Sequence, residues 1–468
     1  MRGRVLVAGA LVVAAAIALV VALAAGSSGG SSGSDASATS AAALTTPLWS
    51  VRRVPEPVVE AVGAQHLQAA LDAAAPGDGT CFVVNAGNHT IATHGADTPL
   101  IGASTQKLLV AAAALSVLGP DSTFQTKAVA SAPPSGGTVD QVWLVGGGDP
   151  VLATGDYAAF LQSQPKTKGD VTTSLESLAD AVVAKGVRSI PGGVVGDDSR
   201  YDQQRYLPTW KDTYRTDGEI GPISALTVND GFSTGSPSRK VPVDDPTRNA
   251  AAELTDLLKA RGVQVGSPST GTAPGDASEI AAISSPPLRD VVHSMLSSSD
   301  NLTAEMLTKE LGVQTSKQGT TQAGVAAISA KLEALGVPLA DGALKDGSGL
   351  DRGNRVTCAN LVAALTLAQR PEFATLYDGL PVAGRNGTLV GDFLGTPLEG
   401  NFRGKTGSLD GVTGLTGVFD LGRRIQFAFL DNGQFGETQG EVIREGIGDI
   451  IGRYPDAPPV DVLVPAPQ

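Results

Sequence analysis

Three short motifs along this chain of 468 residues contain the side chains that covalent acyl transfer requires. In order, they are Ser104-Thr105-Gln106-Lys107, Ser299-Asp300-Asn301 and Lys405-Thr406-Gly407. They supply a hydroxyl nucleophile, a lysine that can deprotonate it, a serine and asparagine pair, and a second lysine. Each motif alone is short enough to arise by chance, but the ordered set is specific. It indicates an acyl-transfer site that works without histidine.

Helix geometry explains how the first motif could work. An apolar helical pattern begins near Ser104 and ends at Gly119-Pro120. Ser104 and Lys107 are three positions apart, so their side chains would share one helix face. Unpaired N–H groups and the positive dipole end of the helix favour the oxyanion that forms when Ser104 attacks a carbonyl. Burial and a neighbouring cation, for which Lys405 is the candidate, would lower the pKa of Lys107 and make it a base.

Two other matches to nucleophile motifs are interpreted as chance. Ser163-Gln164-Pro165-Lys166 repeats the Ser-x-x-Lys spacing, but it contains a proline and no long apolar helix follows it. Gly29-Gly30-Ser31-Ser32-Gly33 matches the Gly-x-Ser-x-Gly pattern of hydrolases, but no strand precedes it and no helix follows it. Neither match predicts a second active site.

The second and third motifs predict groups that assist the reaction and bind substrate. In a turn, Ser299 could pass protons between the lysines and the leaving group, while Asn301 offers an amide to the substrate. The segment could also be a helix N-cap, because a helical pattern begins at Asn301. Lys405-Thr406-Gly407-Ser408 precedes two strand-like runs, and on an edge strand its lysine and hydroxyls would suit a substrate carboxylate. The alternative is an ordinary exposed strand start.

These motifs resemble those of the D-alanyl-D-alanine carboxypeptidase/endopeptidase family, the class C low-molecular-mass penicillin-binding proteins. The resemblance runs from about Leu48 to Gly452 and includes Leu144–Pro150, Val195–Ser199, Ala225–Asn229, Asp346–Leu350 and Leu380–Arg385. It implies that Ser104 attacks the carbonyl of a D-Ala-containing peptide bond in a peptidoglycan stem peptide, and that water resolves the acyl-enzyme. It also implies an oxyanion hole from the N–H groups of Ser104 and Ser408, and covalent inhibition by β-lactams.

A substrate side pocket is also implied by the resemblance. Trp210 and Asp212 resemble a family segment that lines this pocket, and Arg352 resembles a family arginine that faces it. An aspartate beside an arginine could hold the amine and the carboxylate of a diaminopimelyl end. The alternative is a surface ion pair and a core tryptophan.

Composition restricts the other partners. The net charge of −13 argues against a nucleic-acid partner and against a basic membrane-surface patch. The four histidines have no metal-like spacing and two cysteines cannot build a zinc site, so we expect no metal or other cofactor. Cys81 and Cys358 could form a disulfide in an oxidising compartment or remain buried thiols, since sequence alone sets no distance.

The N-terminal segment predicts an extracytoplasmic enzyme in the cell envelope. Arg2 and Arg4 precede an apolar run from Val5 to Ala25 that is long enough to span a bilayer. We favour a single transmembrane anchor in residues 1–25, although Ala22-Leu23-Ala24 resembles a signal cleavage site and leaves secretion open. Residues 26–47 are predicted to be a flexible linker and residues 454–468 a disordered tail.

The spacing of the motifs predicts the domain organisation. Strands at both ends with helices between them indicate an α+β fold, a penicillin-binding or β-lactamase-like catalytic domain with an antiparallel sheet and a helical cluster. We assign this domain to residues 48–125 and 283–453. The long segment between the first two motifs has its own strands and helices, so residues 126–282 are predicted to be a large α/β-type insertion.

Two other functions could account for the same three motifs. A class A β-lactamase would resolve the acyl-enzyme with a glutamate, usually in Glu-x-x-Leu-Asn, and no such string lies between Asn301 and Lys405. A non-catalytic cell-wall binding protein would not need Ser104, Lys107 and Lys405 intact. A serine-type D-Ala-D-Ala carboxypeptidase/endopeptidase is therefore the favoured prediction.

Overall fold

The structure is a computed structural model that describes residues 56–233, 240–340 and 342–456. The predicted N-terminal anchor or signal segment, the linker at 26–47 and most of the predicted tail lie outside these residues. Within the described part of the chain, no helix is both long enough and apolar enough to cross a membrane. At the C-terminal end, Tyr454 is buried against the core, so the ordered chain extends slightly into the predicted tail.

An antiparallel sheet joins the two ends of the described chain. Its strand order is β12-β13-β14-β1-β2, with β12 (Arg403–Leu409), β13 (Val412–Asp420), β14 (Arg424–Asn432), β1 (Thr80–Ala86) and β2 (His89–His94). Strand β1 pairs with β14, which places Thr80 opposite Asp431. Hairpins connect β1 to β2 and β13 to β14, with Gly87 and Gly422 in their turns, and the third motif lies in the edge strand β12.

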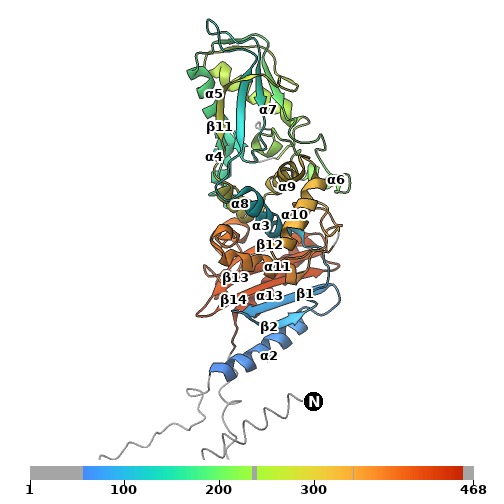
Figure 1. The fold of residues 1–468 in the computed structure, drawn as a ribbon. Coiled ribbons are helices and arrows are strands. Elements are labelled where there is room, and N and C mark those ends of the chain that lie inside the picture. Colours follow the sequence, from blue (N-terminus) through green and yellow to red (C-terminus); the bar gives the residue numbers. More distant parts are fainter. Residues whose placement is uncertain (1–55, 234–239, 341, 457–468) are drawn as a thin grey trace, which may run out of the picture. The chain divides into compact units, whose positions relative to one another are not determined.

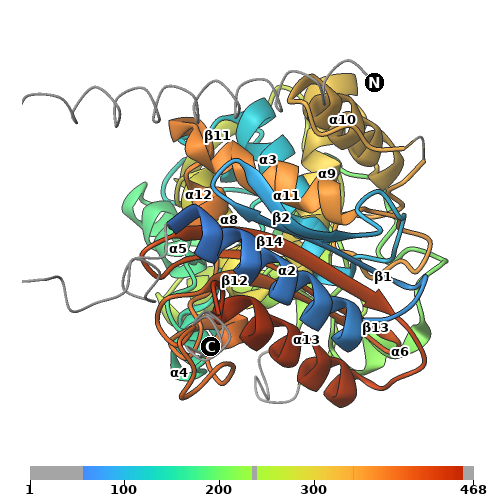
Figure 2. The same cartoon turned by 90° about the horizontal axis from the view of Figure 1, so that it is seen from below.

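Helices cover both faces of this sheet. Figure 2 shows α2 and α13 side by side over one face, while α3, α8 and α11 lie on the other in Figure 1. The helices are α2 (Glu56–Ala74), α3 (Lys107–Leu118), α8 (Leu288–Ser298), α9 (Asn301–Ser316), α10 (Thr321–Ala334), α11 (Cys358–Thr366), α12 (Thr375–Asp378) and α13 (Glu437–Gly452). Helix α3 is apolar on all sides and buried from Lys107 to Leu115, as expected for a helix that crosses the core. The antiparallel sheet with a helical cluster confirms the predicted α+β fold.

A disulfide connects the two flanks of this unit. Cys81 in β1 is bonded to Cys358 at the start of α11, with their Cα atoms 6.0 Å apart. Both residues are fully buried. Of the two possibilities that the sequence left open, the structure has the disulfide.

A second sheet is formed by the segment between the first two motifs. Its strand order is β10-β8-β4-β3-β11, with parallel pairing between β10, β8 and β4 and antiparallel pairing to β3 and β11. Its strands are β3 (Gln125–Ala130), β4 (Val142–Val145), β8 (Val194–Asp197), β10 (Ser269–Thr270) and β11 (Ser278–Ser284), packed with α5 (Leu175–Ala184) and α7 (Pro246–Ala260). The described residues all belong to one compact unit, so the division into two domains stays a prediction.

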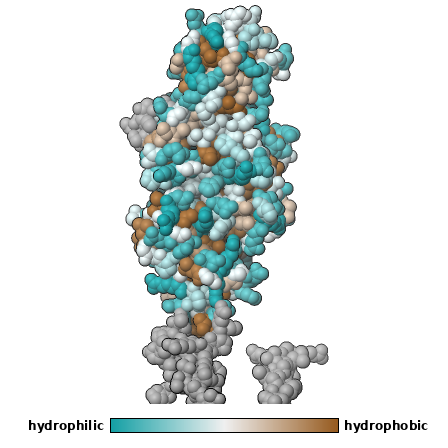
Figure 3. Space-filling model, turned by 90° about the vertical axis from the view of Figure 1, so that its left-hand side faces the viewer, coloured by the Kyte–Doolittle hydropathy of each residue, from teal (hydrophilic) through white to brown (hydrophobic). Residues whose placement is uncertain are grey.

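Short elements complete the chain: β5 (Leu152–Ala153), β6 (Thr173–Ser174), β7 (Ser189–Ile190), β9 (Gln264–Val265), α4 (Gly155–Ser163), α6 (Asp212–Thr216), η2 (Ala103–Gln106), η3 (Asn229–Gly231), η4 (Leu367–Gln369), η5 (Pro371–Phe373) and η6 (Gly387–Leu389). On the face shown in Figure 3, hydrophobic residues are scattered in small groups among hydrophilic ones. This face therefore offers no continuous apolar surface for a partner.

Candidate active site

Ser104 lies on a 3₁₀ turn that leads directly into a buried helix. The turn η2 runs from Ala103 to Gln106, and the regular helix α3 begins at Lys107. The predicted helix is therefore real, but its first turn is tighter than an α-helix. Because side chains three apart eclipse one another in a 3₁₀ turn, the Ser104 hydroxyl faces the Lys107 amine. Their Oγ and Nζ atoms are 2.7 Å apart.

The backbone just before Ser104 adopts an unusual conformation. Ala103 has a φ of 45°, which side-chain-bearing residues rarely adopt and which costs about 1–3 kcal/mol. The loop at Gly349 packs against this point, and a Cβ on Gly349 would lie 2.1 Å from the Ala103 carbonyl oxygen. Only glycine fits there, so the loop holds the strained turn in place.

The Lys107 amine is enclosed by three oxygen atoms. Besides Ser104 Oγ, its Nζ lies 2.7 Å from Asn301 Oδ1 and 2.7 Å from the Ser348 carbonyl oxygen. These two carbonyl oxygens can only accept hydrogen bonds. A neutral amine would therefore direct both of its hydrogens to them and leave its lone pair for the Ser104 hydroxyl. The arrangement fits a base that removes the serine proton.

Burial supplies the protonation state that such a base needs. It lowers the pKa of Lys107 to about 7, although the carboxylates of Asp300, Asp346 and Glu305 act in the opposite direction. The positive charge of Lys166 lowers the pKa further. A substantial fraction of Lys107 is thus neutral at physiological pH, as the sequence argument required.

The second motif spans the end of one helix and the start of the next. Ser299 ends α8 in the left-handed conformation, with a φ of 64°. Asp300 is the N-cap of α9, where its side chain accepts a hydrogen bond from the Leu302 N–H. Asn301 is the first residue of α9, and its Nδ2 donates to the Glu219 carbonyl oxygen at 2.8 Å, which turns its Oδ1 toward Lys107. The predicted helix N-cap is present at Asp300, and the roles of Ser299 and Asn301 in the reaction stay a prediction.

Lys405 completes the polar cluster from the edge strand. It is fully buried in β12, and its Nζ donates to Ser299 Oγ at 2.8 Å and to the Thr406 carbonyl oxygen at 3.0 Å. Burial, and next the charge of Lys107, lower the pKa of Lys405 well below its usual value. The two amines are therefore electrostatically coupled, and an ordinary exposed strand start does not describe this residue.

A buried network that the sequence argument did not assign holds Lys107 in position. Glu305 Oε1 accepts hydrogen bonds from the N–H groups of Gly347 and Ser348, at 2.9 and 2.6 Å. Asp346 accepts from the side chains of Gln106, Trp210 and Asn354. Together they fix the loop whose Ser348 carbonyl contacts Lys107. The glycines of Asp346-Gly347-Ser348-Gly349 were the available signal, but they carry no catalytic side chain.

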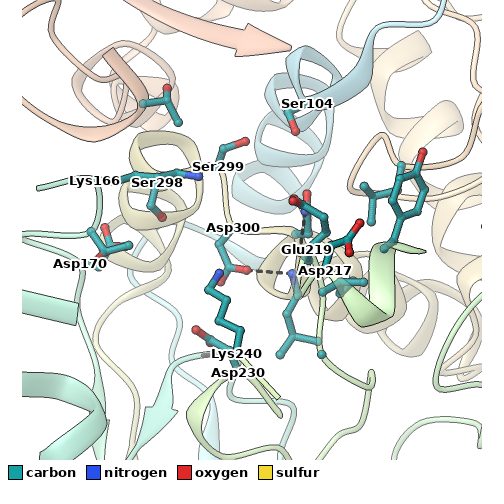
Figure 4. A pocket seen from close by; sticks show the side chains of 18 of the residues that line it. Ser104, Lys166, Asp170, Asp217, Glu219, Asp230, Lys240, Ser298, Ser299 and Asp300 are labelled. Carbon is teal, nitrogen blue, oxygen red and sulfur yellow. Dashed lines mark hydrogen bonds between the residues drawn. The ribbon is translucent and has the colours of Figure 1, made fainter. Parts of the chain in front are cut away.

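A cavity of about 1050 Å³ opens over these groups. It extends from Ser104, Ser299 and Asn301 to residues of the insertion. Figure 4 shows Lys166 directed toward Ser298 and Ser299, with Asp170, Asp230, Lys240 and Asp300 along the same wall. Thr406 and Ser408 from β12 line the opposite side. Lys166, which the sequence argument set aside with its chance motif, is thus part of the cavity.

The three predicted pocket residues are placed differently. Trp210 is buried, and its Nε1 donates to Asp346 Oδ2 at 2.8 Å, so it contacts the network under Lys107. Asp212 and Arg352 are exposed, and Arg352 donates to the Asp410 carbonyl oxygen at 2.8 Å. None of the three is among the described residues that line the cavity, and no ion pair joins Asp212 to Arg352 in that part of the chain. Neighbouring Tyr214 does line it.

The site and the fold together define a class of protein. A serine and a lysine on one turn, a second serine beside a second lysine, and a Lys-Thr-Gly strand at a sheet edge are the parts of serine acyl-transfer enzymes with a lysine base. The sequence comparisons identify the family within this class. Residues 64–238 and 233–453 match the D-Ala-D-Ala carboxypeptidase 3 (S13) family, and the chain belongs to it.

Individual relatives agree with this assignment. The chain is 31% identical over 416 residues to the D-alanyl-D-alanine carboxypeptidase of Actinomadura sp. (strain R39), covering 72% of this chain and 74% of that one. It is also 31% identical over 350 residues to a carboxypeptidase of Mycobacterium tuberculosis, covering 72% of each chain. The predicted enzyme class, a serine-type D-Ala-D-Ala carboxypeptidase, is confirmed.

Solved structures support the fold. Penicillin-binding protein 4 of Haemophilus influenzae superposes with a TM-score of 0.66 at 22% identity, covering 81% of this chain and 97% of that one. The same protein complexed with a β-lactam gives a TM-score of 0.60 at 21% identity, with the same coverage. The predicted penicillin-binding fold is therefore present.

Proposed function

We propose that this protein hydrolyses D-Ala-D-Ala bonds of peptidoglycan stem peptides through an acyl-enzyme on Ser104, and that β-lactams acylate the same serine. The observation that carries the proposal is the position of Lys107 Nζ, 2.7 Å from Ser104 Oγ and 2.7 Å from each of two carbonyl oxygens that would accept the hydrogens of a neutral amine. With a pKa of about 7, this amine can accept the serine proton. Because the substrate is in the cell wall, the enzyme would act outside the cytoplasm.

In acylation, Ser104 transfers its hydroxyl proton to Lys107 while Oγ bonds to the carbonyl carbon of the penultimate D-Ala. The N–H groups of Ser104 and Ser408 are assigned to the developing oxyanion. The carbon–nitrogen bond then breaks, and the proton held by Lys107 reaches the leaving amine through the Ser299 hydroxyl. Lys405, which donates to Ser299 Oγ, orients that hydroxyl for the transfer.

Deacylation follows the steps of acylation in reverse, with water in place of the leaving amine. Water gives a proton to Lys107 as its oxygen adds to the acyl carbon. The bond between that carbon and Ser104 Oγ breaks, and the serine regains the proton. Asn301 offers its amide to the substrate backbone, while Thr406, Gly407 and Ser408 on the edge strand bind the terminal carboxylate.

The specificity residues predicted from the family act in two ways, some at a side pocket and one through the network under Lys107. We assign Asp212 and Arg352 to the side pocket for the stem peptide, with Tyr214 as the neighbour that reaches the cavity. Trp210 acts through Asp346, whose loop carries the Ser348 carbonyl. Comparing Arg352→Ala with wild type on diaminopimelyl substrates and on simple acylated dipeptides tests this pocket. Equal losses on both substrates would refute it.

The remaining assignments concern organisation and location. We propose that residues 126–282 are an insertion domain carried by the catalytic domain, and that residues 1–25 deliver the enzyme across the membrane as an anchor or a signal. Fractionating cells that express the full chain tests the second assignment. An anchor leaves the intact chain in the membrane, whereas a cleaved signal releases a shorter chain.

Labelled penicillin tests the proposed function directly. A peptidase gives stoichiometric, long-lived labelling, since deacylation of the penicilloyl-enzyme is slow. Rapid release of hydrolysed penicillin would favour the β-lactamase alternative, and an absence of labelling would favour a binding protein. Mass spectrometry of products from crosslinked wall fragments then separates release of D-alanine, by carboxypeptidase action, from cutting of crosslinks, by endopeptidase action.

A further inference from the structure

An arginine of the last helix reaches the wall of the active-site cavity. Arg444 in α13 is only 4% exposed, yet it lines the same cavity as Ser104. Its Nη1 donates a hydrogen bond of 2.9 Å to Ser408 Oγ, one residue beyond the Lys-Thr-Gly motif. The sequence argument gave this residue no role, because nothing in its local sequence distinguishes it from other helix residues.

This hydrogen bond determines what the Ser408 hydroxyl can do. The oxygen accepts from the guanidinium, so the hydroxyl hydrogen is free to point elsewhere. Ser408 and Thr406 are two positions apart on β12 and lie on one face of the strand. Both line the cavity. Ser408 is thus a donor directed at the cavity, and the positive partner behind it strengthens its hydrogen bond to an anion.

Two carboxylates lie near the Arg444 guanidinium in addition to Ser408. Its Nη2 lies 3.3 Å from Asp392 and 3.6 Å from Glu441, and Glu441 is half exposed. Its Nε is buried without a hydrogen-bond partner. Burial raises the pKa of Asp392, while the charge and the hydrogen bond of Arg444 lower it. The charge of Arg444 also contributes to lowering the pKa of Lys405, on the same strand as Ser408.

We propose that Arg444 is a positioning residue that acts through Ser408 to select substrates with a free carboxylate on the leaving side of the scissile bond. The inference rests on the proposed function and adds a specificity determinant to it. The ligand class is a C-terminal D-amino-acid carboxylate, or the equivalent carboxylate of a β-lactam. The competing explanation is a purely structural ion pair that ties α13 to Asp392.

Matched substrates test the proposal. For an acylated D-Ala-D-Ala peptide and its C-terminal amide, kcat/KM is measured with wild type, Arg444→Gln, Ser408→Ala and the double variant. We expect Arg444→Gln to lower the carboxylate-to-amide ratio of kcat/KM about tenfold, the effect of one charge-assisted hydrogen bond, mainly through KM. In the Ser408→Ala background the same substitution should change the ratio less than about twofold. Arg453→Ala, an exposed arginine at the end of the same helix, should leave the ratio at its wild-type value.

Three results would overturn the inference. The first is an equal loss on both substrates in Arg444→Gln, and the second is an additive effect in the double variant. Asp392→Asn provides the third and covers the case in which Arg444→Gln does not fold. Asp392→Asn breaks the ion pair but leaves the hydrogen bond between Arg444 and Ser408. The carboxylate-to-amide ratio of kcat/KM should therefore stay at its wild-type value or rise. A fall in this ratio as large as that in Ser408→Ala contradicts the proposal. A wild-type enzyme that penicillin does not label refutes the proposed function instead.

Discussion

The chain contains the Ser-x-x-Lys spacing twice, in two very different surroundings. Ser104 lies at the start of a buried helix, and its hydroxyl contacts Lys107. Ser163 is the last residue of α4, is exposed, and donates its hydroxyl hydrogen to the Phe160 carbonyl oxygen at 2.6 Å. Pro165 then prevents the helix from continuing. The same two residue types at the same spacing thus give a polar cluster in one place and a helix end in the other.

The difference lies in what surrounds the lysine. Lys107 is fully buried, and its Nζ lies within hydrogen-bond distance of carbonyl oxygens from the start of α9 and from the Ser348 loop. Lys166 is exposed to the cavity and has no hydrogen-bond partner or ion pair among the described residues. Burial lowers the pKa of both amines, but only Lys107 is also hydrogen-bonded to oxygen atoms of other segments. A nucleophile motif is defined by the oxygen atoms and the burial that the rest of the fold supplies, and its spacing is only a precondition.

The largest expected effect separates the two serines. Ser104→Ala should abolish covalent labelling by penicillin, because no other hydroxyl is positioned against the Lys107 lone pair. Ser163→Ala should label at the wild-type rate, since its hydroxyl bonds to a backbone carbonyl. Gel fluorescence with a labelled penicillin measures both. Undiminished labelling of Ser104→Ala would show that the nucleophile has been assigned wrongly.

The two lysines should differ by a smaller but still large factor. Lys107→Met removes the base and should reduce the acylation rate about 10²- to 10⁴-fold, the usual contribution of general-base catalysis. Lys166→Met leaves that base in place, so we expect an acylation rate within about fivefold of wild type at pH 7. Stopped-flow measurement of acylation compares them. Similar losses in both variants would mean that Lys166 has a direct part in the reaction.

Removing Lys405 should change the pH dependence as well as the rate. The rate rises with pH as Lys107 loses its proton, so its acidic limb reports the Lys107 pKa. Lys405→Ala removes an amine that interacts electrostatically with Lys107, since the charge of Lys107 lowers the pKa of Lys405. Wherever Lys405 carries its proton, its removal should favour protonated Lys107 and move this limb to higher pH. At neutral pH, acylation should fall about tenfold or more, because carboxylate recognition is weakened too. An acidic limb at the wild-type position would rule out coupling between the two amines.

The smallest expected effect concerns Lys166 as a remote charge. Its charge lowers the pKa of Lys107, so the acidic limb of Lys166→Met should move to higher pH. Salt screens such interactions, and the difference from wild type should shrink as ionic strength increases. Lys168→Met, an exposed lysine two positions away, is the control and should keep the wild-type profile. A shift that is insensitive to salt would indicate a structural change instead.

The sequence predicted the elements that have strong local signals. The β1–β2 hairpin, the helix after Ser104, the helix from Asn301 and the β13–β14 hairpin all follow from turn residues and apolar periodicity. The serine and lysine side chains at the centre of the site were also identifiable, because their order is distinctive. The two-residue strands β9 and β10 were less visible, since their few residues pair with distant partners.

The residues that tune the site could not be found in this way. Ser348 contributes only a backbone oxygen, so its side-chain type carries no information about its role. Glu305 and Arg444 lie inside helices and resemble ordinary polar helix residues until the fold buries them. Lys166 was interpreted as part of a chance motif, yet the path of the insertion brings it to the cavity. In each case the relevant property arises from contacts between segments that are far apart in sequence.

The order of these segments has a consequence for biosynthesis. The strand that carries Lys405 belongs to the last part of the folded chain to leave the ribosome, long after Ser104. A polypeptide that ends before Arg403 has the serine but lacks the edge strand, the second amine and the β14 partner of β1. We therefore expect Ser104 to become reactive only after the C-terminal strands have joined the sheet.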